Sequence, residues 1–276
     1  MGRISDRFAQ LRQQERCALI PFITGGDPSL EATQHLLPVL AQAGADVIEI
    51  GVPFSDPLAD GPTLQKASAR ALQGGTTLDK LFAIIAAARS AVDVPLVFLI
   101  YVNMIIHVGI DSFAQRAQAS GVDGVIVADL PVEESGPVRT ALQSRGVDWI
   151  PLVAPTSGER VVQIAAAGSG FLYCVSSLGV TGVRQQLDPA LREWVNALQS
   201  LTPLPRCVGF GIATAEQAEQ VAAFADGVIV GSALVDRLAK VASMGEAAVE
   251  SEASSFIRTL RDAIDRQQAQ CKQEVR

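Results

Sequence analysis

The sequence predicts a (β/α)8 barrel, in which eight parallel strands are surrounded by helices, with one extra helix at the N-terminus. Two observations favour this fold class. Short apolar runs rich in Val and Ile alternate with longer amphipathic segments, as expected for parallel strands buried on both faces. Eight such units in a chain of 276 residues match the usual length of this fold. No stretch has the composition of a linker, so we expect a single domain over residues 1–276.

The expected elements follow one another in strict alternation, which implies a parallel sheet. The expected strands are Ala18–Ile23, Asp46–Ile50, Pro95–Ile100, Gly124–Ala128, Trp149–Val153, Gly170–Val175, Arg206–Gly209 and Gly227–Val230. The expected helices are Leu30–Ala43, Leu78–Ala91, Phe113–Ser120, Glu133–Ser144, Glu159–Ala167, Pro189–Leu201, Ala215–Phe224 and, near the C-terminus, Glu250–Arg266.

Three turns share one short pattern, which supports a repeated architecture. In each, a helix ends, small residues turn the chain, an aspartate follows and a strand begins; the aspartates are Asp46, Asp123 and Asp226. Aspartate side chains accept hydrogen bonds from turn N–H groups. We therefore expect these residues to be structural acids at the face of the barrel that carries no catalysis.

Composition excludes several classes of function. The net charge is −7 without a basic block, so nucleic acid is a poor partner. No apolar run is long enough to span a bilayer, and the N-terminus lacks the apolar segment of a signal peptide. The four cysteines show no metal-binding spacing. We expect reduced thiols in a cytoplasmic protein, without a metal site.

The segment Glu49–Pro62 holds the strongest chemical signal. Glu49 ends an apolar run, and Asp56 and Asp60 follow in a loop shaped by proline and glycine. At the mouth of a buried strand, Glu49 is placed to exchange protons near neutral pH. The alternative is a buried structural acid paired with an N–H group or an arginine. Since neither a Ser-His-Asp pattern nor a metal cluster is visible, the remaining route is acid–base chemistry by carboxylates.

Glycines follow the last two expected strands, in Gly209–Ile212 and at Gly231 and Ser232. Backbone N–H groups and a helix N-terminus at this edge of a barrel are suited to binding phosphate. Ordinary turn chemistry is the alternative reading. The long segment Ser176–Gly182 after the sixth strand is either a lid over a ligand or a plain surface loop.

These residues together resemble a known family. The chain is similar to tryptophan synthase alpha chains in a series of motifs that run in the family's order, the long segment after the second strand being the most specific. They are Pro21–Pro28, Glu49–Gln65, Asp129–Glu134, Gly179–Gly182, Gly209–Ile212 and Gly231–Ala233.

The resemblance implies a retro-aldol cleavage of indole-3-glycerol phosphate to indole and glyceraldehyde 3-phosphate. Glu49 matches the family's principal acid–base residue, which handles the proton on indole C3. Asp60 matches the carboxylate that accepts a hydrogen bond from the indole N–H and stabilises positive charge on the ring.

Other positions carry over from the family as substrate-binding residues. Barrel core is the alternative reading of Phe22, Leu99 and Ile126. One departure is visible, because the family often has a proline after Tyr-Asn, where this chain has Met104. The implied binding residues are Phe22, Leu99, Ile126, Tyr173, Thr181, Gly182, Phe210, Gly211, Gly231 and Ser232.

The resemblance also implies a partner, a beta chain that carries pyridoxal phosphate and joins indole to serine in an alpha2beta2 tetramer. No cofactor is expected in this chain. Asp56 and Pro57 match the contact region, with a turn cap as the alternative for Asp56. Two competing functions are a stand-alone lyase that releases free indole and a non-catalytic subunit. The second would predict a lost acid, yet Glu49 and Asp60 are both present.

Overall fold

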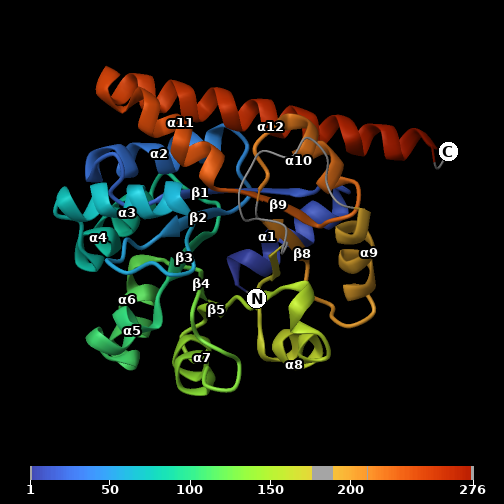
Figure 1. Cartoon of the computed structure of the whole chain (residues 1–276), viewed down its shortest axis with the longest axis horizontal. Coiled ribbons are helices and arrows are strands. Elements are labelled where there is room, and N and C mark those ends of the chain that lie inside the picture. The colour runs from blue at the N-terminus through green and yellow to red at the C-terminus, as the bar shows by residue number, and fades with distance from the viewer. Residues whose placement is uncertain (1, 176–188, 210, 275–276) are drawn as a thin grey trace.

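Nine parallel strands form one curled sheet, with helices packed around its outside (Figure 1). The computed structural model describes residues 2–175, 189–209 and 211–274. The strands are β1 Ala18–Thr24, β2 Ile48–Gly51, β3 Leu96–Ile100, β4 Gly124–Val127, β5 Asp148–Trp149, β6 Leu152–Val153, β7 Leu172–Val175, β8 Arg206–Gly209 and β9 Gly227–Val230. Their order in the sheet is β5-β4-β3-β2-β1-β9-β8-β7-β6.

The two outermost strands of that order are halves of one expected strand, Trp149–Val153. The strand is interrupted at Ile150 and Pro151, but its hydrogen bonding continues on both sides. The Ile150 N–H bonds the Val125 carbonyl at 2.9 Å, and the Pro151 carbonyl accepts from the Tyr173 N–H at 2.9 Å. With β5 and β6 counted as one strand, the sheet closes into the predicted eight-stranded barrel.

All eight expected helices are present, with shifted ends. Pro62 begins the further helix α3, because a proline at the first helical position loses no hydrogen bond. The last helix continues to Glu274 through strong helix formers. The helices are α1 Arg3–Gln13, α2 Leu30–Gln42, α3 Pro62–Gln73, α4 Leu78–Ala88, α5 Val102–Val108, α6 Ile110–Ser120, α7 Gly136–Gln143, α8 Arg160–Ala167, α9 Pro189–Leu198, α10 Ala215–Ala222, α11 Ser232–Val241 and α12 Glu246–Glu274, with short 3-10 turns η1 Pro155–Ser157 and η2 Ala242–Met244.

The extra N-terminal helix α1 closes one end of the barrel. Its residues Ile4, Phe8 and Leu11 are buried among the side chains of the barrel interior, and α1 lies in the middle of the ring of helices in Figure 1. On the outside, α12 packs against α2, α10 and α11. None of the described helices is long and apolar enough to cross a membrane.

The three repeated aspartates have the structural role that their pattern predicts. Each accepts a backbone N–H of the neighbouring strand at 2.8 Å: Asp46 from Leu19, Asp123 from Leu96 and Asp226 from Arg206. Each also pairs with an arginine. Two of these arginines come from α1. Arg7 bonds Asp46 at 2.6 Å, and Arg3 bonds Asp123 at 2.9 Å. The pairs therefore fasten α1 to the end of the barrel opposite the catalytic face.

Replacing Asp123 by alanine should destabilise the fold strongly. Its side chain is only 8% exposed and is shared by Arg3, Arg89 and the Leu96 N–H. Breaking a buried pair leaves an uncompensated charge, so we expect a loss of about 3–5 kcal/mol in the free energy of unfolding. Asp111→Ala is the control, because Asp111 is 89% exposed and should cost about 1 kcal/mol or less. Equal urea midpoints for the two variants would contradict this role.

Candidate active site

The carboxyl ends of the strands gather the predicted chemical residues at one face of the barrel. Glu49 lies on β2, in register with Phe22 on β1 and with Val97 on β3. Paired residues of a parallel sheet point to the same side. Val97 belongs to the interior cluster, so the side chain of Glu49 also points into the barrel.

Glu49 lies in an environment that favours its protonated form. The residue is 1% exposed, and its Oε2 atom finds no hydrogen-bond partner among the described residues. Burial, and secondarily the negative charge of Asp60, raise the pKa of Glu49 to about 8. Within the described part of the chain, no lysine or arginine forms an ion pair with it. Of the structural alternative, pairing with an arginine is therefore not found among the described residues, and pairing with an N–H group stays open.

Asp60 occupies the loop between β2 and α3, one residue before the N-cap of α3. Partial burial raises its pKa to about 6, and a hydrogen bond with Tyr101 opposes that rise. The Gln65 side chain donates to the Asp60 carbonyl at 2.9 Å, which ties the residue to the first turn of the helix. At pH 7 the two carboxyl groups thus differ, with Glu49 mostly protonated and Asp60 mostly ionised.

Tyr101 was not predicted as a site residue, although it stands at the end of β3. Its hydroxyl accepts the Ala59 N–H at 3.0 Å, and its ring stacks on Phe54 at 5.1 Å between centroids. It also bonds the Asp60 carboxylate. Tyr101 therefore holds the loop that carries Asp60 at three points. The signal in the sequence was the position of an aromatic hydroxyl directly after a strand.

Tyr173 lies on β7 beside both acids. It is buried, and desolvation followed by the charge of Glu49 raises its pKa far above the usual range, with a smaller effect from Asp60. Gly209 on β8 makes room for the ring, because a Cβ atom there would lie 2.7 Å from the Tyr173 hydroxyl oxygen. The prediction that Tyr173 supports Glu49 or lines a subsite stays open, and its position suits either role.

Phe22 and Leu99 form the apolar wall next to Glu49, and Leu64 from α3 joins them in one cluster. Sequence reasoning missed Leu64 because its helix was not delimited. Ile126 is different: it is fully buried in the barrel interior together with Tyr173. The surroundings of Ile126 therefore fit a residue of the barrel core at least as well as a residue that lines a binding site.

The expected phosphate-binding residues lie where the last two strands end. Gly211 follows β8 with φ +78°, a conformation that side-chain-bearing residues rarely adopt. Gly231 follows β9, and Ser232 is the first residue of α11. The first N–H groups of a helix have no partners within it and bind anions. Three further predicted residues, Thr181, Gly182 and Phe210, lie outside the described residues, as does the segment Ser176–Gly182.

The loop before α3 also presents the expected partner-facing residues. Asp56 is exposed and accepts the Ser55 hydroxyl at 2.6 Å, and Pro57 is half-buried. Next to them, Leu58 is 93% exposed. A single exposed leucine is common on protein surfaces, so the expectation that this loop meets a partner stays a prediction.

Met104, the departure from the family pattern, lies inside helix α5. Its N–H bonds the Tyr101 carbonyl at 3.1 Å, a bond that proline could not make. The Asp129 carboxylate accepts the Val102 N–H at 2.8 Å and so caps the helix. With Met104 in place of proline, the segment after Tyr101 therefore forms an ordered helix.

Among the described residues, no group of His, Cys, Asp and Glu could hold a metal ion.

Comparison with known proteins gives one consistent result. The family model described as "Tryptophan synthase alpha chain" matches residues 8–265. The tryptophan synthase alpha chain of Synechococcus elongatus is 48% identical over 269 residues, covering 97% of this chain and 98% of that one. The chain of Geobacter sulfurreducens is 46% identical, covering 96% and 99%. The crystal structure of the alpha subunit from Legionella pneumophila superposes with a TM-score of 0.89 at 37% identity, covering 96% and 99%.

Proposed function

Because the chain belongs to the tryptophan synthase alpha chain family, we propose that Glu49 and Asp60 carry that family's reaction here. The chain is a lyase that cleaves indole-3-glycerol phosphate to indole and glyceraldehyde 3-phosphate, and the indole passes to a beta chain for L-tryptophan synthesis. No feature of the described residues favours release of free indole as the chain's function.

The observation that supports this assignment is the different surroundings of the two acids: Glu49 is fully buried, whereas Asp60 is half-buried and bonded by Tyr101. Protonated Glu49 donates its proton to indole C3, and the ring becomes a cation. Ionised Asp60 accepts the indole N–H and stabilises that cation as it forms. Two carboxyl groups with separated pKa values are the arrangement expected for separate acid and charge-stabilising roles.

Glu49 then completes the cleavage as a base. Its carboxylate takes the proton of the hydroxyl on the carbon attached to C3, and an aldehyde carbonyl forms there. The carbon–carbon bond breaks, and its electron pair returns to the ring and neutralises the cation. The proton lost to C3 is replaced by the hydroxyl proton, so Glu49 ends the cycle in its starting form.

The remaining residues are proposed to bind the substrate. Phe22, Leu99 and Leu64 form an apolar wall for the indole ring, with Tyr173 beside the acids and Ile126 in the layer beneath. Backbone N–H groups at Gly211, Gly231 and Ser232 face the phosphate. Thr181, Gly182 and Phe210 are proposed as further binding residues from the family motifs alone.

A carboxylate introduced at the phosphate site should weaken substrate binding. Gly231→Asp places a negative charge at the start of α11, where the substrate's phosphate is proposed to lie. Like charges brought together in a binding site cost several kcal/mol, so we expect KM to rise at least about tenfold. Gly136→Asp is the control, since it adds the same group at the start of α7 with open space around it. An unchanged KM in steady-state cleavage would refute the phosphate site.

We propose a beta chain with pyridoxal phosphate as the partner, in an alpha2beta2 tetramer. Asp56, Pro57 and the exposed Leu58 are the residues proposed to face it. No lysine lies on a strand of the described sheet, which supports placing the cofactor in the partner rather than in this chain. We also propose a cytoplasmic location, which the buried free thiols support. We propose one domain over residues 1–276, which the packing of α12 along the barrel supports.

Asp56→Ala should change coupling to the beta chain without changing the isolated chain. The residue is exposed and touches none of the proposed reacting groups. We expect the beta-chain concentration for half-maximal activation to rise roughly tenfold, the effect of losing one interfacial charge pair. Glu134→Ala, an exposed acid in another loop, is the control. If the isolated Asp56→Ala chain, without beta chain, itself cleaves the substrate about tenfold more slowly, Asp56 acts in catalysis instead.

A further inference from the structure

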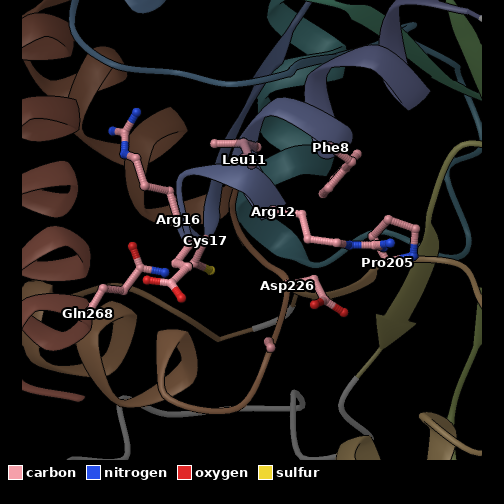
Figure 2. A pocket seen from close by; sticks show the side chains of 10 residues that line it. Phe8, Leu11, Arg12, Arg16, Cys17, Pro205, Asp226 and Gln268 are labelled. Atoms are coloured by element: carbon pink, nitrogen blue, oxygen red, sulfur yellow. The ribbon is translucent and has the colours of Figure 1, made fainter. Parts of the chain in front are cut away.

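A cavity lies at the end of the barrel opposite Glu49. It has a volume of about 210 Å³ and is lined by α1, by the residues that precede β1, β8 and β9, and by α12 (Figure 2). Phe8 and Leu11 supply buried apolar surface, and Pro205 adds to it. Arg12, Glu15, Arg16, Asp226 and Gln268 supply polar groups. Of these, Arg16 is paired with Asp265 at 3.4 Å and Glu15 also has an interaction of its own, which leaves Arg12, Asp226 and Gln268 to meet a ligand. The proposed reaction uses none of these residues.

The cavity interrupts a regular pattern of ion pairs. Two arginines of α1 each meet one of the repeated aspartates, Arg3 with Asp123 and Arg7 with Asp46. The third aspartate of that pattern, Asp226, shares the cavity with Arg12, which lies at the C-terminal end of α1. In the part of the chain that the structure describes, the Arg12 guanidinium forms no ion pair. Asp226 pairs instead with Arg206, and at this third position the cavity lies where an arginine of α1 would otherwise meet the aspartate.

Asp226 and Gln268 both have acceptor atoms without partners. Asp226 receives the Arg206 N–H and Nε at 2.8 and 2.9 Å, both on Oδ2, which leaves Oδ1 without a hydrogen bond from any described residue. The Oε1 atom of Gln268 is buried and likewise has no partner among the residues placed by the structure. The Gln268 acceptor is buried without a donor, which is unfavourable. The Asp226 side chain is 39% exposed, so its Oδ1 atom is open to a ligand that brings donors.

We propose that this cavity binds a small α-amino acid with an aliphatic side chain. Its carboxylate pairs with Arg12, its ammonium group donates to Asp226 Oδ1 and Gln268 Oε1, and its side chain packs on Phe8 and Leu11. A simple anion would satisfy Arg12 but would face the charge of Asp226. A simple cation would satisfy the acceptors and leave Arg12 unpaired. The volume corresponds to about seven waters at roughly 30 Å³ each, enough for a ligand of roughly ten non-hydrogen atoms.

Calorimetric titration with L-leucine tests the proposal on the full chain. We expect a dissociation constant below about 10 mM, and at least tenfold weaker binding of 4-methylpentanoate and of isopentylamine, which each keep one of leucine's two charges. Leucine should also raise the Tm, because a ligand that binds only the folded state stabilises it. Arg12→Gln should weaken leucine binding at least tenfold. The matched control Arg139→Gln, on α7, should leave it unchanged.

Three results would overturn the proposal: no heat and no Tm shift at saturating leucine, equal binding of a one-charge analogue, or unchanged binding by Arg12→Gln. Inorganic phosphate binding that is lost in Arg12→Gln, without leucine binding, would assign a plain anion site instead. The Glu49→Gln chain should bind leucine like the parent chain. Failure of this site is therefore distinguishable from failure of the proposed catalytic roles.

Discussion

Glu49→Gln should lower kcat for cleavage of indole-3-glycerol phosphate by about 10²–10⁴-fold, the usual contribution of a positioned acid–base group. Glutamine keeps the shape of the protonated acid but has no proton to donate at C3 and cannot accept one from the hydroxyl. Because Glu49 has no ion pair among the described residues, the substitution leaves no charge unpaired, and the free energy of unfolding should change little. KM should also change little, since the proposed binding contacts lie on other residues.

The pH dependence gives an independent readout of the same role. In the parent chain, kcat/KM should rise as Asp60 ionises near pH 6 and fall as Glu49 loses its proton near pH 8. The residual activity of Glu49→Gln should lack the alkaline limb, because glutamine does not titrate. Glu133→Gln, which changes an exposed acid in the loop between β4 and α7, is the control. A decrease in kcat of less than about tenfold would contradict the assignment.

Asp60→Asn should lower kcat by about 10²–10³-fold, the range found when one group that stabilises transition-state charge is removed. The amide can still accept a hydrogen bond from the indole N–H but carries no negative charge to balance the ring cation. A second effect follows from the electrostatics of the pair. Since the charge of Asp60 helps raise the pKa of Glu49, the alkaline limb of kcat/KM should move to lower pH in this variant.

Asp56→Asn is the matched control for Asp60→Asn, because it makes the same chemical change four residues earlier in the same loop. It should leave the rate of the isolated chain and both limbs of its pH profile in place. If Asp60→Asn shifts KM alone, with kcat and the alkaline limb unchanged, Asp60 binds the ground state and does not stabilise the reacting cation.

Local pattern was sufficient for much of the fold and part of the site. Alternation of apolar strands with amphipathic helices depends on neighbours in the chain, and so does the position of Glu49 at a strand end. The turn aspartates were also correctly interpreted, because an Asp before a buried strand has few partners other than backbone N–H groups. The end of α12 and the starts of α3 and α7 were missed or displaced, since helix ends depend on what packs against them.

The site required distances that no local pattern contains. Tyr101 holds the Asp60 loop, Leu64 extends the apolar wall beside Phe22, and Arg12 lines the same cavity as Asp226. Each pair joins residues far apart in the sequence or on different elements, and closure of the barrel brings them together. The interruption of the expected strand Trp149–Val153 also depends on distant residues. Its first half, β5, pairs with β4 and its second half, β6, pairs with β7.

The sequence by itself determined the barrel class, the order of its units and the presence of two acids around the loop after β2. It could not determine what those acids do, because the charge state of a carboxyl group depends on its desolvation and on the charges nearby. Folding buries Glu49 completely, brings Asp60 near it and sets Tyr101 against Asp60. Only that arrangement separates the two pKa values to about 8 and about 6 and so supports the proposal that one of two similar side chains donates a proton and the other is a stabilising anion.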